Sequence, residues 1–230
     1  MRAIAPFAVI ALVTALMTAT GAAAVAHVTL TVRLYNTGRV PAAALLLARD
    51  TATAILADGG LSIRVRHCGS VVSPAAVPDR CAEPLKPAEV VMRVLDAPAF
   101  TTSVHPDAFG VSYVVQDTDR GWLATVFADR VRDAAARAGA SHGALLGRVM
   151  AHELGHLLLG SGYHGSAGVM RAHWPDAILT RNGAEWRFSG AEAARMRDVL
   201  ASIAGDATQT KPGQRDSDNV VALSARLTPR

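Results

Sequence analysis

Two histidines and a glutamate stand together in the pentapeptide His152-Glu153-Leu154-Gly155-His156. Residues four apart on an α-helix project from one face, so His152 and His156 can present two imidazole nitrogens to a single metal ion. Glu153 lies one residue further round the helix, close enough to hold a metal-bound water and to accept its proton. Imidazole ligands favour zinc, although copper and nickel also accept them. The spacing therefore predicts a zinc site that activates water.

The surrounding segment has the pattern of a buried helix. Ser141 is a suitable N-cap for it. Apolar residues follow at helical spacing, at Leu145, Leu146, Val149, Leu154, Leu157 and Leu158. A lone histidine is usually a surface residue or a hydrogen-bonded core residue, whereas two histidines at this spacing, with a glutamate between them in an apolar helix, favour a metal site. We therefore expect this helix to position both histidines.

A zinc hydrolase needs a third protein ligand and leaves a fourth position for water. His164 is the expected third ligand, because Gly160 and Gly162 permit the backbone turns that return its side chain to the metal. Glu192 and Glu185 are alternatives from further along the chain.

Two further observations bear on the choice of the third ligand. Glu192 already has a structural use, because it stands at the capping-box position after Ser189. His173 is another candidate, but Trp174-Pro175 beside it suggests a packed corner. His164 is therefore preferred.

At this point the chain resembles the metzincin clan of zinc metallopeptidases, whose motif HExxHxxGxxH is followed by a methionine in a tight turn beneath the metal. His152, Glu153 and His156 match this motif residue for residue. Leu159 stands where the family has glycine, with a glycine one position later. His164 lies eight residues after His156, where the family spacing is six. The resemblance covers the first part of the motif and departs from it in the loop.

By this resemblance, Met170 is the methionine of the turn and forms a hydrophobic floor under the histidines; from its spacing alone it is equally an ordinary core methionine. The resemblance implies an α+β fold class, with a single zincin-like domain, a twisted mixed β-sheet, an active-site helix and a C-terminal helix. Residues 189–203 have the pattern of that last helix. Substrate would lie extended along an edge strand, for which residues 109–115 are the candidate.

The expected function is that of a secreted zinc metalloendopeptidase in which His152, His156 and His164 hold the ion. Zinc lowers the pKa of its bound water, and Glu153 accepts the proton as general base before passing it to the leaving amine of a peptide or protein substrate. One alternative is an exported module that binds zinc without catalysis. A second is a gluzincin-type hydrolase with Glu192 as third ligand. Glu153 argues against the first, because a structural site has no need of that carboxylate.

The rest of the chain alternates between strand and helix patterns, which predicts a mixed sheet. The strand patterns cover residues 27–35, 61–66, 89–95, 110–115 and 123–127, and a helix pattern covers residues 41–56. Asp117, Asp119 and Gly121 favour a hairpin turn over a calcium loop, because the glutamate that closes such a loop is missing. Residues 130–138 either begin a helix or form an exposed connection.

The first 26 residues have the pattern of a signal peptide. Arg2 precedes an apolar stretch without charge, and small residues at Ala22, Ala24 and Ala26 suit a cleavage site. An uncleaved anchor helix in the cell envelope is the alternative. We expect export to the medium or the periplasm, without stable membrane insertion after cleavage. The expected organisation is a domain over residues 27–205 and a flexible tail over residues 206–230.

The cysteine content agrees with export, and the charge pattern bears on possible partners. Cys68 and Cys81 are the two cysteines of the chain, and in an oxidising compartment such a pair closes a disulfide that pins a loop, with two buried thiols as the alternative. Half of the 230 residues are apolar and 18% are charged, which excludes disorder of the whole chain. The net charge of +4 is scattered, without a basic run interleaved with aromatic residues, so no nucleic-acid partner is expected. A monomer is expected.

Overall fold

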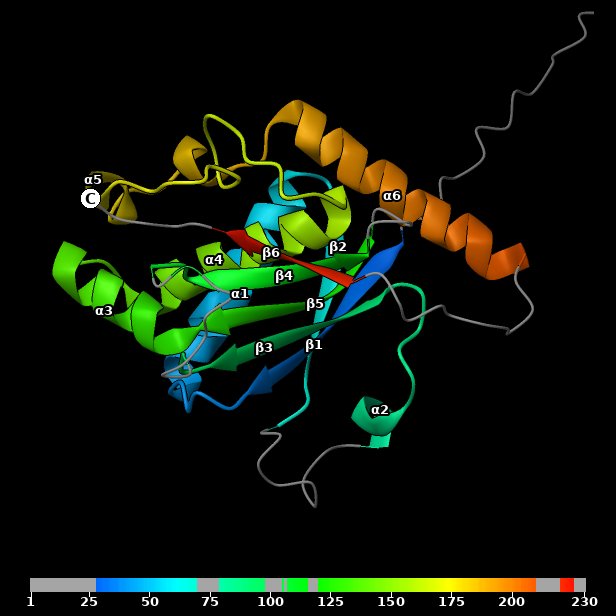
Figure 1. Ribbon diagram of the computed structural model, residues 1–230, viewed down its shortest axis with the longest axis horizontal. Helices are drawn as coiled ribbons and strands as arrows, with labels where there is room; N and C mark the ends of the chain where they lie inside the picture. Colours follow the sequence, from blue (N-terminus) through cyan, green and yellow to red (C-terminus); the bar gives the residue numbers. More distant parts are fainter. Residues whose placement is uncertain are drawn as a thin grey trace, which may run out of the picture.

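A mixed sheet with strand order β2-β1-β3-β5-β4-β6 forms the framework of the computed structural model (Figure 1). The structure describes residues 28–69, 79–97, 105, 107–115, 120–209 and 220–225. The strands are β1 (Thr29–Asn36), β2 (Ser62–His67), β3 (Glu89–Leu95), β4 (Gly110–Val115), β5 (Arg120–Phe127) and β6 (Val220–Ala225). Strands β2, β1, β3 and β5 are parallel to one another, whereas β4 pairs antiparallel with both β5 and β6.

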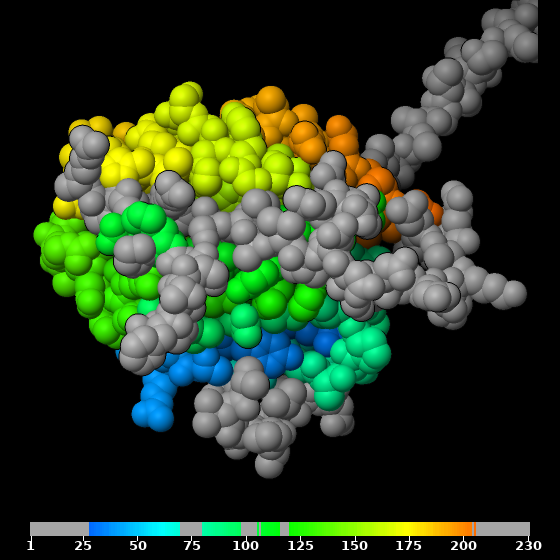
Figure 2. Space-filling view, in the orientation of Figure 1, coloured from blue at the N-terminus to red at the C-terminus, as the bar shows by residue number. Residues whose placement is uncertain are grey.

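Four longer helices accompany the sheet: α1 (Ala42–Asp58), α3 (Ala128–Ala138), α4 (His142–Leu159) and α6 (Gly190–Gln209). The short elements are α2 (Asp79–Ala82), α5 (Asp176–Leu179) and the 3₁₀ turn η3 (Ala184–Trp186). Figure 1 shows α1 and α4 behind the sheet. Figure 2 shows the segments that follow α4, coloured yellow to orange, on one side of the molecule, with blue and green segments of the sheet on the other. The fold is therefore α+β with a mixed sheet, as the sequence predicts.

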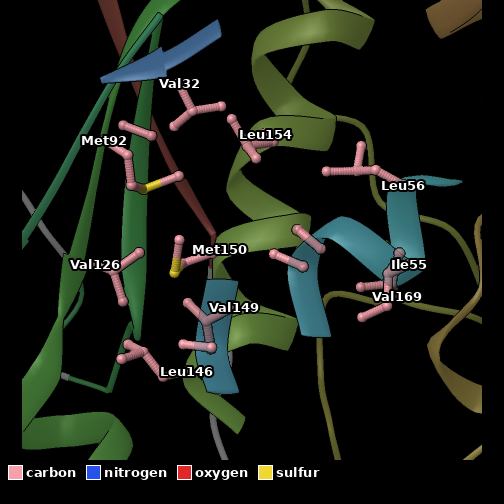
Figure 3. Close-up of a cluster of buried hydrophobic side chains, with 14 of the residues drawn as sticks. Val32, Ile55, Leu56, Met92, Val126, Leu146, Val149, Met150, Leu154 and Val169 are labelled. Atoms are coloured by element: carbon pink, nitrogen blue, oxygen red, sulfur yellow. The ribbon is translucent and has the colours of Figure 1, made fainter. Parts of the chain in front are cut away.

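The core lies between the sheet and the two central helices. Figure 3 shows Val32, Met92 and Val126, one from each of β1, β3 and β5, facing side chains of α4. All three are buried, as are Leu146 and Met150 of α4. Alternate residues of a strand point to the same face, so the apolar alternation along β1, β3 and β5 produces one continuous surface that α4 covers.

Helix α4 is the central element of this core, and its ends are set by capping residues. The Ser141 hydroxyl accepts a hydrogen bond from the Ala144 amide at 3.4 Å. Gly160 ends the helix in a left-handed conformation with φ of 67°, which costs glycine little. Every residue of α4 after Ala144 is buried, so the helix that carries the two motif histidines is held rigidly.

Two glycines on α4 let it approach α1 closely. A Cβ atom at Gly143 would come 2.8 Å from the Ala44 carbonyl oxygen, and one at Gly147 would come 2.6 Å from the Thr51 Cβ atom. Because side chains at these positions would force the helices apart, their absence allows α1 and α4 to pack backbone against backbone.

Most of the predicted elements are present with small shifts at their ends. Strands β3 and β4 have the predicted bounds, and α1 begins after Pro41 and continues to Asp58. Residues 128–138 form the helix α3. The sequence had allowed either the start of a helix or an exposed connection for residues 130–138. The expected signal peptide lies outside the described residues, as do Asp117 and Asp119 of the expected hairpin turn, whereas Gly121 lies in β5.

The C-terminal region differs from the expected tail in two places. Helix α6 continues to Gln209, and residues 220–225 form β6 against β4. Residues 109–115 were expected to offer a free sheet edge, but β6 pairs with β4 along its whole length. That expectation was wrong, because hydrogen bonding to a distant strand leaves little trace in a strand's own pattern.

The predicted disulfide between Cys68 and Cys81 is present. Arg33, buried in β1, donates hydrogen bonds to the carbonyl oxygens of Cys81 and Glu83, at 3.2 and 2.5 Å, and pairs with the buried Glu89 carboxylate. The disulfide and Arg33 together anchor the segment that leads into β3. Among the described residues, no helix combines the length and the apolar character needed to cross a bilayer.

Candidate metal centre

Three histidines converge at the C-terminal end of α4. His152 and His156 lie one turn apart on the helix, and His164 lies in the loop that follows it. One ring nitrogen from each falls within 4.8 Å of the others, and the two Nε2 atoms of His152 and His156 are 3.0 Å apart. The structure therefore brings together the three residues that the sequence proposes as metal ligands.

Backbone carbonyls determine which nitrogen of each helical histidine carries the hydrogen. The Nδ1 atom of His152 lies 2.7 Å from the carbonyl oxygen of Val169, and that of His156 lies 3.0 Å from the carbonyl oxygen of Ser161. A carbonyl oxygen only accepts hydrogen bonds, so both Nδ1 atoms must donate. Each Nε2 atom then presents its lone pair toward the other, an arrangement that repels unless a cation lies between them.

The third imidazole has an available nitrogen as well. Nε2 of His164 is buried and, within the described part of the chain, has no hydrogen-bond partner. A buried polar atom without a partner is costly and calls for an explanation such as a bound ion. This donor set, three imidazole nitrogens within 4.8 Å of one another, fits zinc.

Burial keeps the three rings neutral. It is the largest cause lowering the pKa of His152 well below its usual value, and repulsion from His156 lowers this pKa further. Burial also lowers the pKa of His156 to about 4 and lowers that of His164. Since only the neutral imidazole can bind a metal, these shifts leave the lone pairs available at neutral pH.

The loop after α4 is folded back by the segment that follows it. The Gly165 amide donates to the Met170 carbonyl oxygen at 2.9 Å, and Gly165 forms an isolated bridge with Arg171. This closed loop places His164 beside the two helical histidines although it is longer than the metzincin spacing. The loop length alone therefore does not keep His164 from the cluster.

The other candidate ligands have different positions. The Glu192 carboxylate accepts a hydrogen bond from the Ser189 amide at 2.7 Å, while the Ser189 hydroxyl accepts one from the Glu192 amide at 3.3 Å. This is the capping box predicted for α6. Glu185 lies 3.7 Å from the guanidinium of Arg181. Neither glutamate nor His173 belongs to the cluster of His152, His156 and His164.

Met170 lies directly beneath the helix that carries the histidines. It is fully buried, and a Cβ atom at Gly155 would collide with its sulfur. Gly155 lies between the two ligand positions on α4, so the missing side chain admits Met170 there. The rings of Trp174 and His152 pack perpendicular to each other, with their centroids 5.6 Å apart. Met170 and Trp174 thus form an apolar layer around the histidines.

Glu153 is fully buried and faces β4. The Ser112 hydroxyl donates to its Oε2 atom at 2.7 Å, and Oε1 has no partner among the described residues. Burial raises the pKa of Glu153 to about 8, against the opposing effect of the Ser112 hydrogen bond. A carboxyl group whose pKa lies near neutrality is suited to proton transfer.

Sequence reasoning identified the histidines and Glu153 but missed their supports. Ser112 contacts Glu153 from 41 residues away in the chain, and the carbonyl group of Val169 contacts His152 from 17 residues away. The alternating pattern of β4 predicts a strand there, but no local signal shows that it lies against Glu153. These supporting contacts depend on the tertiary fold alone.

Comparisons with known proteins agree with this fold. No protein-family model matches the chain, and no curated protein matches its sequence. Among solved structures, the crystal structure of archaemetzincin from Methanopyrus kandleri is similar, with a TM-score of 0.51 and 16% identity, over 75% of this chain and 96% of that one. The likeness shows that the chain shares its overall fold with that protein.

Proposed function

We propose that this protein is a zinc-dependent peptidase whose ion is held by His152, His156 and His164. The observation that carries the proposal is the convergence of three neutral imidazoles next to buried Glu153, whose Oε1 atom has no hydrogen-bond partner among the described residues. The fold shared with archaemetzincin adds support. Zinc, when bound, supplies an acidified water and a positive charge that polarises the scissile carbonyl.

Glu153 supplies the proton transfers in this proposal. Its Oε2 atom is engaged by Ser112, which leaves Oε1 as the oxygen that accepts a proton and returns it to the leaving amine. Its buried position excludes solvent that would otherwise stabilise the ionised form, so the carboxyl group can hold the proton between the two transfers.

Export is a further part of the proposal. The Cys68–Cys81 disulfide is of the kind that persists in oxidising compartments, which agrees with the signal-peptide pattern of residues 1–26. We propose a peptide or protein substrate and a monomeric enzyme without a nucleic-acid partner. Export, substrate class and oligomeric state are independent of the metal site and are tested separately.

A zinc-binding module without catalysis is the second candidate function. The complete burial of His152, Glu153 and His156 favours it, because a substrate must reach a catalytic site. The size of the cluster argues against a non-catalytic module. Among the described residues the cluster has three candidate ligands, whereas structural zinc sites usually have four protein ligands.

Two measurements on the full chain separate these functions. Zinc content is determined by metal analysis, and a broad peptide library is incubated with the protein with and without a chelator. A peptidase cleaves peptides in a zinc-dependent manner. Bound zinc without any cleavage would instead identify the non-catalytic module, and absence of bound zinc would contradict both.

A further inference from the structure

We propose that Ser112 is a positioning residue that orients Glu153 for proton transfer. The inference rests on the proposed peptidase function, because it assigns Glu153 the role of general base. It concerns a residue on β4, outside the motif helix and its loop, that the sequence did not single out.

The Ser112 hydroxyl lies within hydrogen-bond distance of two oxygen atoms of Glu153. The Ser112 hydroxyl oxygen lies 2.7 Å from Oε2 of Glu153 and 3.0 Å from the Glu153 carbonyl oxygen. Both residues have no exposed surface. The hydroxyl hydrogen therefore faces two acceptors of one residue, and water does not compete for it. A buried hydrogen bond is not weakened by competing water, so it restricts the rotation of the Glu153 side chain.

Gly110 completes the surface against which Glu153 lies. It precedes Ser112 by two residues, so both positions face the same side of β4. A Cβ atom at Gly110 would come 2.5 Å from Oε1 and 2.7 Å from Cδ of Glu153. Even an alanine there would displace the carboxyl group. Gly110 thus leaves the space, and Ser112 fixes the orientation within it.

In this arrangement the two carboxyl oxygens of Glu153 have different roles. Oε2 is bound to Ser112, and Oε1 remains without a hydrogen bond among the described residues. If the hydroxyl were removed, the carboxyl group would lose the bond that distinguishes its oxygens and would rotate. A general base that is displaced by a fraction of an ångström loses much of its efficiency, whereas contacts that bind the rest of the substrate are unaffected.

The experiment compares Ser112→Ala and Ser112→Cys with the native full chain. Ser112→Ala removes the donor, and Ser112→Cys keeps a weaker donor of similar shape. Ser62→Ala is the matched control, because it removes an exposed hydroxyl from β2, at the opposite end of the sheet from β4 and β6. For each variant, kcat, KM, zinc per chain and the midpoint of urea unfolding are measured.

The positioning role predicts a loss in kcat of about 10- to 100-fold for Ser112→Ala, with KM within about threefold of native and zinc content unchanged. Ser112→Cys gives an intermediate kcat, and Ser62→Ala equals native. A kcat for Ser112→Ala within about twofold of native overturns the proposal. The proposal is also overturned if Ser112→Cys loses zinc in the same proportion as it loses kcat, because that result indicates a merely structural role.

A second measurement does not depend on activity. The urea midpoints of Ser112→Ala, Glu153→Gln and the double variant are compared with that of the native chain. If the two side chains are coupled, the double variant shifts by less than the sum of the single shifts, and additive shifts overturn the contact. If the native chain binds zinc but cleaves no peptide, the peptidase proposal fails, while this comparison still reports on the Ser112–Glu153 contact.

Discussion

The ring of His152 is held in place by the backbone of Val169, whose carbonyl oxygen lies 2.7 Å from Nδ1. Val169 directly precedes Met170, which packs against Gly155 on the same helix. One short segment therefore sets the hydrogen position of a candidate ligand and packs against the helix that carries it. A hydrogen bond of this type also raises the basicity of the other ring nitrogen, which faces His156. The centre thus depends on the segment after the loop as much as on the motif helix.

His164→Ala tests the third ligand. Removing one of three imidazoles is expected to weaken zinc binding by about 100-fold or more, because two protein ligands hold the ion poorly. Zinc affinity is measured by competition with a chromophoric chelator. His173→Ala is the matched control, since this partly exposed histidine lies outside the cluster. An unchanged affinity in His164→Ala would transfer the role to another group.

Gly155→Ala tests the packing of Met170 under the helix. The new methyl group collides with the Met170 sulfur and comes 3.0 Å from the Phe188 ring. We expect the free energy of unfolding to fall by about 1–3 kcal/mol, as measured by urea denaturation. Gly205→Ala on α6 has no atom within 4 Å of its new Cβ, and it should be neutral or slightly stabilising. Equal stability of the two variants would contradict the close contact.

The raised pKa of Glu153 gives the metal-free chain a characteristic pH dependence. Its folded pKa of about 8 lies above the usual value of 4.5, so the folded state binds the proton more tightly than the unfolded state. The stabilisation this provides is complete below pH 4.5 and is lost as the pH rises through about 8.

The corresponding measurement compares the native chain with Glu153→Gln, after zinc has been removed from both. Between pH 5 and pH 8 the native chain is expected to lose on the order of 4 kcal/mol of unfolding free energy relative to the variant. The histidines are common to both proteins, so their titration cancels in the difference. Parallel stability curves for the two chains would show that Glu153 is not buried as described.

Replacing Cys68 and Cys81 together by serine tests the disulfide. The bond spans a sequence separation of 13 residues. Its loss should lower the free energy of unfolding by about 3 kcal/mol, because the unfolded chain gains conformational freedom. Zinc content should stay the same, since Cys81 is bonded through its carbonyl to Arg33 and Tyr35 of β1. A loss of zinc in this variant would show that the loop also supports the metal centre.

The sequence predicted those parts of the fold that local patterns determine. Alternation gave β3 and β4 their bounds, and the cap at Ser141 and the stop at Gly160 define α4. The capping box predicted at Ser189 and Glu192 is present. In each case the physical cause lies within a few residues of the element itself.

The remaining features depend on contacts between distant segments. The pairing of β6 with β4 joins residues far apart in the chain, and the sequence of residues 220–225 does not show which strand they pair with. Likewise, Ser112 is an ordinary strand residue until the fold places it 2.7 Å from Glu153. The histidine cluster could be predicted because its spacing on one helix is itself the signal, whereas its supports could not.

Zinc content and peptide hydrolysis, measured together on the native chain and on Glu153→Gln, test the central claim most directly. We predict about one zinc per chain in both proteins, and a loss of kcat of about 10²- to 10⁴-fold in the variant, because its amide cannot accept the proton. Hydrolysis by the native chain should disappear with a chelator and return with zinc. A Glu153→Gln variant that cleaves peptides at the native rate would contradict the account.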